Sequence, residues 1–93
     1  MKIGLLQIKI EIPWALSLKD KRSAVKSLKD RISGRFNVAV SETGDMDYKN
    51  SAELSVVTVS NAAVMNDKIL ASVVNYVETD KNVELVDYRT ERL

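Results

Sequence analysis

The sequence predicts an α+β sandwich in which four strands and two helices follow one another in the order β-α-β-β-α-β. Two stretches carry apolar residues at helical spacing, and four shorter stretches alternate apolar and polar residues as strands do. The chain is 93 residues long and 45% hydrophobic, which suits one domain with a single modest core. Two split β-α-β halves of this size form a four-stranded antiparallel sheet with both helices on one face. We therefore predict a single ferredoxin-like domain over residues 1–93.

The first half supplies a strand and a helix. Apolar and polar residues alternate over residues 3–12, and Pro13 ends the strand because proline cannot donate to a strand ladder. Ser17 suits the N-cap position of a helix, because its hydroxyl can accept a hydrogen bond from the first turn. The apolar stripe that follows predicts a helix over residues 18–33, with Gly34 placed to end it.

The second half repeats the pattern with an added hairpin. Its predicted elements are a strand at 36–42, a polar connection at 43–50, a strand at 51–59, a helix at 62–78 and a strand at 83–90. Val56 and Val57 interrupt the alternation of the third strand, which indicates a bulge or burial on both faces. Ser60 or Asn61 is expected to cap the second helix. The first and third strands are the most apolar, as the two central strands of this topology should be.

The composition excludes whole classes of chemistry. The chain has no cysteine and no histidine, which removes disulfides, thiol nucleophiles, thiolate zinc sites and histidine proton shuttles. No nucleophile–base pair is evident, so we expect neither catalysis nor a cofactor. Residues 1–12 lack the continuous apolar run of a signal peptide, and no run approaches the length that spans a bilayer. We expect a cytoplasmic protein that does not associate with membranes and has no small-molecule substrate.

Half of the basic residues fall in one short segment of the first helix. Seven of the 14 lysines and arginines lie between residues 19 and 35, where the only acidic residues are Asp20 and Asp30. They are Lys19, Lys21, Arg22, Lys26, Lys29, Arg31 and Arg35. The whole chain carries a net charge of only +1, so the molecule is polarised and the remainder is mildly acidic. A concentrated positive face indicates an anionic partner.

The spacing of these cations places four of them on one face of the predicted helix. Lys19, Arg22, Lys26 and Lys29 are three, four and three residues apart, and no carboxylate is expected among them. Lys21 should point nearer the core, with its ammonium reaching water. Cations in the first turn oppose the helix dipole at a cost of about a few tenths of a kcal/mol each, so stability does not explain them. The predicted RNA- or ribosome-binding residues are Lys19, Lys21, Arg22, Lys26 and Lys29. The alternative is a solvated, solubilising helix face.

Other surfaces favour protein partners instead. Trp14 and Leu16 lie in the connection between the first strand and the first helix, where Trp14 is either a partner anchor or folds back over its own core. Apolar residues are also expected on the sheet face that the helices leave open, namely Ile3, Leu5, Ala39, Val57, Val59, Val86 and Tyr88. A homodimer through this face or along an edge strand is therefore expected. Docking through Trp14, Leu16 and the open face is the alternative to RNA binding.

Ferredoxin-like folds host several functions, and the residues of this chain decide among them. RNA-recognition domains stack bases on aromatic residues of the central strands, but the third strand offers Glu53, Ser55 and Val57 there. The acidic residues near 42–47 could attract a divalent cation, yet they lack the regular ligand spacing of a calcium loop and are explained by turn chemistry. We therefore predict no metal site.

The run Ser17-Leu18-Lys19-Asp20-Lys21-Arg22 resembles the YlxP-like family of small bacterial proteins of unassigned function. Further matches are Ile3-Gly4, Phe36-Asn37-Val38, Ser41-Glu42, Asp47 ahead of Ala52, and Ser60-Asn61, so the resemblance covers nearly the whole chain. It implies a ferredoxin-like fold with no established activity. Members are often encoded beside factors for transcription, translation initiation and ribosome maturation, which implies a role near ribosomal RNA by association. The chain departs from the family pattern at Tyr48-Lys49-Asn50-Ser51.

Overall fold

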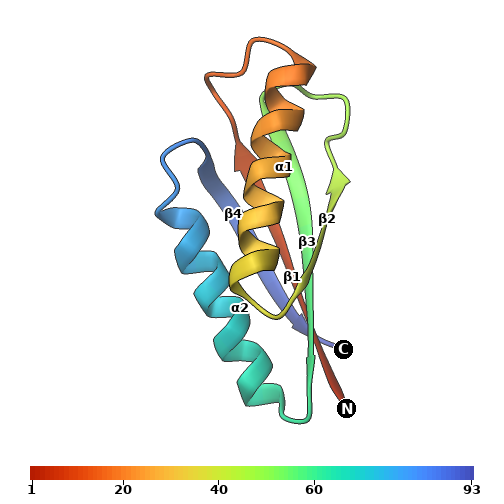
Figure 1. The fold of residues 1–93 in the computed structure, drawn as a ribbon. Helices are drawn as coiled ribbons and strands as arrows, with labels where there is room; N and C mark the ends of the chain where they lie inside the picture. Colours follow the sequence, from red (N-terminus) through yellow and green to blue (C-terminus); the bar gives the residue numbers. More distant parts are fainter.

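The computed structural model describes all 93 residues and has the predicted element order. The elements are β1 (Lys2–Glu11), α1 (Leu18–Arg35), β2 (Ala39–Gly44), β3 (Ser51–Ser60), α2 (Ala63–Glu78) and β4 (Glu84–Arg92). The strands form one antiparallel sheet in the order β2-β3-β1-β4, and both helices cover the same face of it (Figure 1). This confirms the ferredoxin-like sandwich and the central position of β1 and β3.

The core lies between the two helices and the covered face of the sheet. Sixteen buried hydrophobic residues form one cluster there. Six of them come from alternate positions of β1 and β3, for which Ile8 opposite Leu54 is a representative pair, and seven come from the two helices. Gly4 allows α2 to approach β1 closely, because a Cβ at this position would lie 3.1 Å from both Asn66 and Leu70. Neither helix is long and apolar enough to cross a membrane.

The end of α1 differs from the prediction. The helix continues through Gly34 to Arg35, and no glycine in the chain adopts a positive φ, so Gly34 does not end it. Phe36 is the C-cap, and its N–H donates to the Ile32 carbonyl at 2.9 Å. The Phe36 ring then packs edge-on against Tyr76 of α2, with 5.9 Å between the ring centroids. Because this contact anchors the segment after α1 to the other helix, β2 begins at residue 39 rather than 36.

The irregular pairings of the sheet also lie elsewhere than expected. The β1–β3 ladder is unbroken through Val56 and Val57, so a bulge there is wrong; instead Val56 is buried on the helix side and Val57 is half-buried on the other. The register shifts instead at Glu42/Gly44 in the β2–β3 ladder and at Lys9/Ile10 in the β1–β4 ladder. The second shift places Tyr88 opposite core residue Ile8 and therefore on the helix side. The open face retains Ile3, Leu5, Ala39, Val57 and Val59, which are paired neighbours in the ladders.

The second helix begins one residue later than predicted. Its N-cap is Ala62, which makes no side-chain cap hydrogen bond, so neither Ser60 nor Asn61 has that role. The Ser60 hydroxyl instead accepts from the Ala62 N–H at 3.2 Å and contacts the Asn66 side-chain oxygen at 2.7 Å. Asn66 is buried at the start of the helix, which fixes how α2 leaves β3.

Two loops meet at the end of the molecule where α1 begins (Figure 1). The Asn50 side-chain amide donates to the carbonyls of Ile12 and Ala15, both at 2.9 Å. The Ile12 N–H in turn donates to the Asn50 carbonyl at 2.8 Å. These three bonds tie the β1–α1 connection to the end of the β2–β3 hairpin, so the start of α1 is held against both central strands.

Candidate nucleic-acid interface

The start of α1 is fixed by reciprocal hydrogen bonds. The Ser17 hydroxyl accepts from the Asp20 N–H at 3.1 Å, as expected for an N-cap. The Asp20 carboxylate accepts from the Leu16 N–H at 3.0 Å, one residue before the cap. Asp20 thus contributes to the cap, and its carboxylate gives the Leu16 N–H an acceptor that the helix backbone does not provide. The cations of the first turns project from this ordered end.

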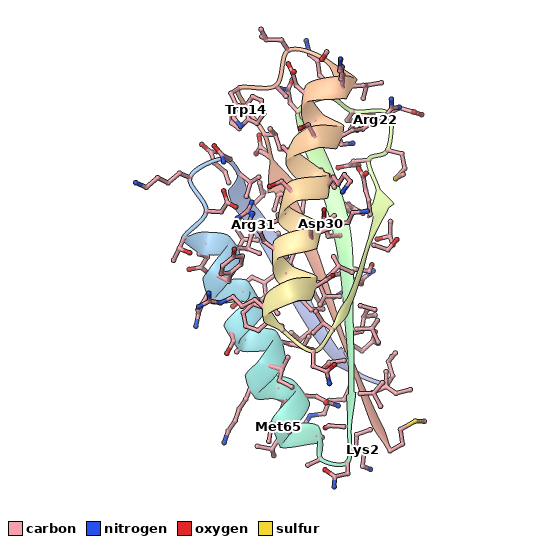
Figure 2. All side chains as sticks on the ribbon, in the orientation of Figure 1. Lys2, Trp14, Arg22, Asp30, Arg31 and Met65 are labelled. Atoms are coloured by element: carbon pink, nitrogen blue, oxygen red, sulfur yellow. The ribbon has the colours of Figure 1, made fainter.

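The four cations of the predicted face do share one flank of α1, which we call the basic flank and define as Lys19, Arg22, Lys26 and Lys29. Figure 2 shows Arg22 on the side of α1 away from α2, opposite Arg31. The other three members lie three, four and seven residues from Arg22 and so fall beside it. Lys19, Arg22 and Lys26 are exposed and Lys29 is half-buried.

The basic flank contains one carboxylate, contrary to the sequence-based expectation. Lys26 Nζ lies 2.7 Å from the Asp30 carboxylate, one helical turn along. The hydrogen bond and the charge of Asp30 raise the pKa of Lys26, and Lys26 lowers the pKa of Asp30. Both groups are exposed, so the pair is screened by solvent and contributes little to stability. Four cations and one carboxylate leave the basic flank three positive charges.

Lys21 is a structural lysine, and the expectation that its ammonium reaches water is wrong. It lies four residues before Val25 and seven before Leu28, on the core side of α1, and its side chain is fully buried. Its Nζ lies 2.8 Å from the Glu42 carboxylate and donates to the Asp45 carbonyl at 2.6 Å. A third, longer bond runs to the Met46 carbonyl at 3.3 Å. Lys21 thus fastens the β2–β3 hairpin to α1 and is withdrawn from any RNA-binding surface.

Two acidic residues of the hairpin, Glu42 and Asp45, form ion pairs with lysines. Glu42 pairs with Lys21, and the Asp45 carboxylate lies 3.7 Å from Lys9 Nζ on β1. Asp45 is the one non-glycine residue with positive φ, at 57°, which marks the point where the chain turns out of β2. Glu42 and Asp45 are therefore used in ion pairs and turn geometry, as the turn-chemistry interpretation of this loop requires.

Trp14 combines features of both of its predicted roles. Its indole Nε1–H donates to the Asn82 carbonyl at 2.7 Å, so the ring folds back toward the α2–β4 connection. Nevertheless 48% of the residue is exposed. Leu16, by contrast, is 82% exposed. The structure therefore separates the two residues of the predicted interaction site: Trp14 is held in place and Leu16 is free.

The α2-facing flank of α1 carries a second set of cations, each bound by groups of the protein. Arg31 lies 2.7 Å from the Asp80 carboxylate, whose side chain is 3% exposed, and donates to the Tyr76 hydroxyl at 3.3 Å. Burial alone would lower the pKa of Arg31, but the hydrogen bonds to Asp80 and Tyr76 outweigh it and raise the pKa. Arg35 lies over the rings of Tyr76 and Phe36, at 5.2 and 5.9 Å from their centroids.

Sequence reasoning did not identify this second cluster. Arg31 and Arg35 belong to the basic segment in the sequence, but Tyr76, Asp80 and Asn82 are 41 or more positions further along the chain. A helical projection would have placed Arg31 and Arg35 on the opposite flank from Arg22. Their partners could be assigned only once the fold brings the α2–β4 connection beside α1.

The structure defines the class of protein: a ferredoxin-like domain that carries the basic flank on α1 and contains neither cysteine nor histidine. Residues 3–90 match the family model described as "Protein of unknown function (DUF503)". The chain is also 32% identical over 89 residues to the uncharacterised protein YlxP of Bacillus subtilis strain 168, covering 96% of this chain and 97% of that protein. The protein belongs to the DUF503 family, which confirms the resemblance to YlxP-like proteins.

Proposed function

We propose that this protein is a non-enzymatic accessory domain that binds structured RNA in the cytoplasm, alone or within the ribosome, through the basic flank of α1. The observation that carries this proposal is the clustering of Lys19, Arg22, Lys26 and Lys29 on one flank with three net positive charges. From Lys19 to Lys29 the flank extends about 15 Å at 1.5 Å per residue, long enough to contact more than one phosphate. These cations are absent from the core, and Lys19 and Arg22 near the start of α1 oppose the helix dipole, so binding is a better reason for them than stability.

Salt dependence is the test of this proposal. Neutralising three or four phosphates should weaken binding roughly 40- to 150-fold between about 50 and 200 mM salt, from a slope near −0.9 per duplex phosphate. The measurement is fluorescence anisotropy with a labelled RNA hairpin at several salt concentrations. Apolar docking of a protein through Leu16 and the open sheet face would show almost no such dependence.

A matched pair of variants locates the contact. The triple variant Arg22→Ser, Lys26→Ser and Lys29→Ser should lose most of the affinity and flatten the salt dependence. The control Lys2→Ser, Lys49→Ser and Lys68→Ser removes the same charge from exposed lysines on β1, the hairpin and α2. Equal losses in both triples would show that only net charge matters, and absence of binding to the wild-type protein at low salt would remove the proposal.

We also propose that two copies of the chain associate along β4, which has a neighbouring strand only on the β1 side. If β4 pairs with itself antiparallel about Tyr88, Asp87 lies opposite Arg89 of the second copy. Centring the pair on Arg89 would instead place Asp87 opposite Glu91. Opposite charges across strands stabilise a pair and like charges oppose it, so the sequence of β4 favours the first register.

A charge exchange tests this association. Asp87→Lys should shift the protein toward monomer in sedimentation experiments, because lysine would face arginine across the two-fold axis. Adding Arg89→Asp to the same chain restores opposite charges and should restore the dimer. A strict monomer at every accessible concentration, or failure of the second substitution to rescue the first, would overturn this arrangement.

A further inference from the structure

We propose that the groove between α1 and the α2–β4 connection binds an unpaired RNA base, which stacks on Trp14. The groove is a hollow of about 240 Å³ lined by Trp14, Ser23, Ala24, Ser27, Arg31 and Asn82. A second hollow of about 360 Å³ shares Arg31 and Asn82 and extends toward Tyr76 and Lys81. The first volume lies just below, and the second just above, the lower end of the range for small-molecule sites, about 300–1,000 Å³. The inference rests on the proposed RNA-binding function and adds an unpaired base to the ligand.

Trp14 has the geometry of a preformed stacking surface. Its hydrogen bond to the Asn82 carbonyl fixes the ring, and the neighbouring Ala15 is buried in the core. About half of the residue nevertheless remains exposed. A ring that is ordered before binding loses little conformational entropy when a base stacks on it. Every base has a π-face, so such a surface accepts different sequences.

The remainder of the groove is polar and cationic, which favours a nucleotide over an apolar protein anchor. Apart from Trp14, the only hydrophobic residue that lines the first hollow is Ala24. Ser23 and Ser27 bring hydroxyl groups from α1 for the polar edge of a base. Arg31 borders both hollows, but its charge is met by Asp80, which also lines the second hollow. Lys81 is the exposed cation of the second hollow, where a neighbouring phosphate would lie.

The position of the groove relative to the basic flank gives the two surfaces distinct roles. Figure 2 shows Trp14 and Arg31 on the side of α1 toward α2 and β4, with Arg22 on the other side. An RNA with a paired stem and an unpaired loop or end can place phosphates along the basic flank and one base in the groove. Because the groove takes only the unpaired base, single-stranded RNA is sufficient to probe it.

Trp14 is the only tryptophan of the chain, so its fluorescence reports directly on the groove. Titration of the full-length protein with a single-stranded oligoadenylate decamer should quench this fluorescence to saturation and protect the ring from acrylamide. Trp14→Leu should weaken decamer binding, measured by anisotropy, roughly 5- to 150-fold, the range expected for loss of one stacked base. Leu16→Ala is the matched control and should leave the affinity unchanged, because Leu16 is exposed next to the groove but not part of it.

A second variant leaves Trp14 in place. Ser23→Leu fills the hollow from an exposed position of α1 and should prevent quenching without changing the thermal unfolding midpoint. If the decamer binds with no change in fluorescence or acrylamide access, the groove proposal is overturned while the basic flank stands. If quenching occurs but the basic-flank triple variant binds RNA normally, the groove stands and the basic flank does not.

Discussion

The two flanks of α1 carry cations of the same kind in different states. On the side away from α2, Lys19 and Arg22 have no protein partner and only Lys26 meets a carboxylate. On the side toward α2, Arg31 is bound to a nearly buried Asp80 and Arg35 lies over two aromatic rings. The first group is available to a ligand as charge, and the second mainly holds the two helices and the α2–β4 connection together.

Lys21 extends this comparison to a third state. It is adjacent in sequence to Arg22, yet one residue of rotation takes its side chain under the hairpin, where it is fully buried. The basic segment therefore divides into buried, protein-bound and free cations according to angular position on one helix. The charge available to a partner is accordingly smaller than the count of lysines and arginines in the segment.

The comparison of buried and free cations predicts the largest loss of stability at Lys21. Lys21→Met should destabilise the fold by about 3–5 kcal/mol, because it leaves the Glu42 carboxylate buried without a counter-charge and two carbonyls without a donor. This is a large share of the stability of a small domain. Urea unfolding followed by circular dichroism measures the change.

The control for Lys21 is a lysine two residues away. Lys19→Met removes the same charge from an exposed position and should change the unfolding free energy by less than about 0.5 kcal/mol. Lys21→Met combined with Glu42→Gln should recover part of the loss, because the buried carboxylate is then neutral. Similar effects for Lys19→Met and Lys21→Met would show that Lys21 does not hold the hairpin.

A smaller loss is expected at Asp80, on the α2-facing flank. Asp80→Asn removes the charge that Arg31 meets at 2.7 Å but keeps a side-chain oxygen of similar size. Arg31 is 40% exposed and can be hydrated, so the cost should be about 1–2 kcal/mol rather than that of a fully buried pair. Thermal unfolding measures it, and Asp47→Asn in the hairpin is a control without an ion pair. An unchanged midpoint for Asp80→Asn would contradict a structural role for this flank.

The order of elements and the central strands could be predicted because they depend on local signals. Alternating apolar residues, Pro13 and the Ser17 cap each act within a few positions. The end of α1 could not, since the contact between Phe36 and Tyr76 joins residues 40 positions apart and overrides the local signal of Gly34. Likewise the shift at Lys9/Ile10 depends on pairing between β1 and β4, so the side to which Tyr88 points was predicted incorrectly.

The candidate site was predictable to the same extent: local spacing could be read from the sequence, and long-range partners could not. Helical spacing correctly placed the four cations of the basic flank together, because rotation per residue is a property of any helix. It could not show that the Lys21 ammonium meets oxygens from a hairpin 21 or more positions away. Nor could it show that the indole of Trp14 bonds to a carbonyl 68 positions away. Partners of long side chains depend on the tertiary structure.

The smallest effect concerns the one carboxylate on the basic flank. Asp30→Asn should leave stability unchanged within error, because Asp30 and Lys26 are both exposed. It should nevertheless strengthen RNA binding at low salt roughly two- to fivefold, the size of an exposed ion pair, by freeing Lys26 and removing a charge that repels phosphate. Anisotropy with the labelled hairpin measures this gain, which should shrink as salt is added.

The pKa of Asp30 sets the pH range in which this gain should be seen. Because Lys26 lowers the pKa of Asp30 in the folded protein, the pair is present at neutral pH and is lost only as pH falls through that lowered pKa. The variant and the wild-type protein should therefore differ at pH 7. Asp67→Asn on α2 is the matched control, since Asp67 is also an exposed carboxylate whose pKa is lowered by a cation, Arg92. An equal gain from both variants would show that RNA senses only net charge, whereas a gain confined to Asp30→Asn places the phosphate beside Lys26.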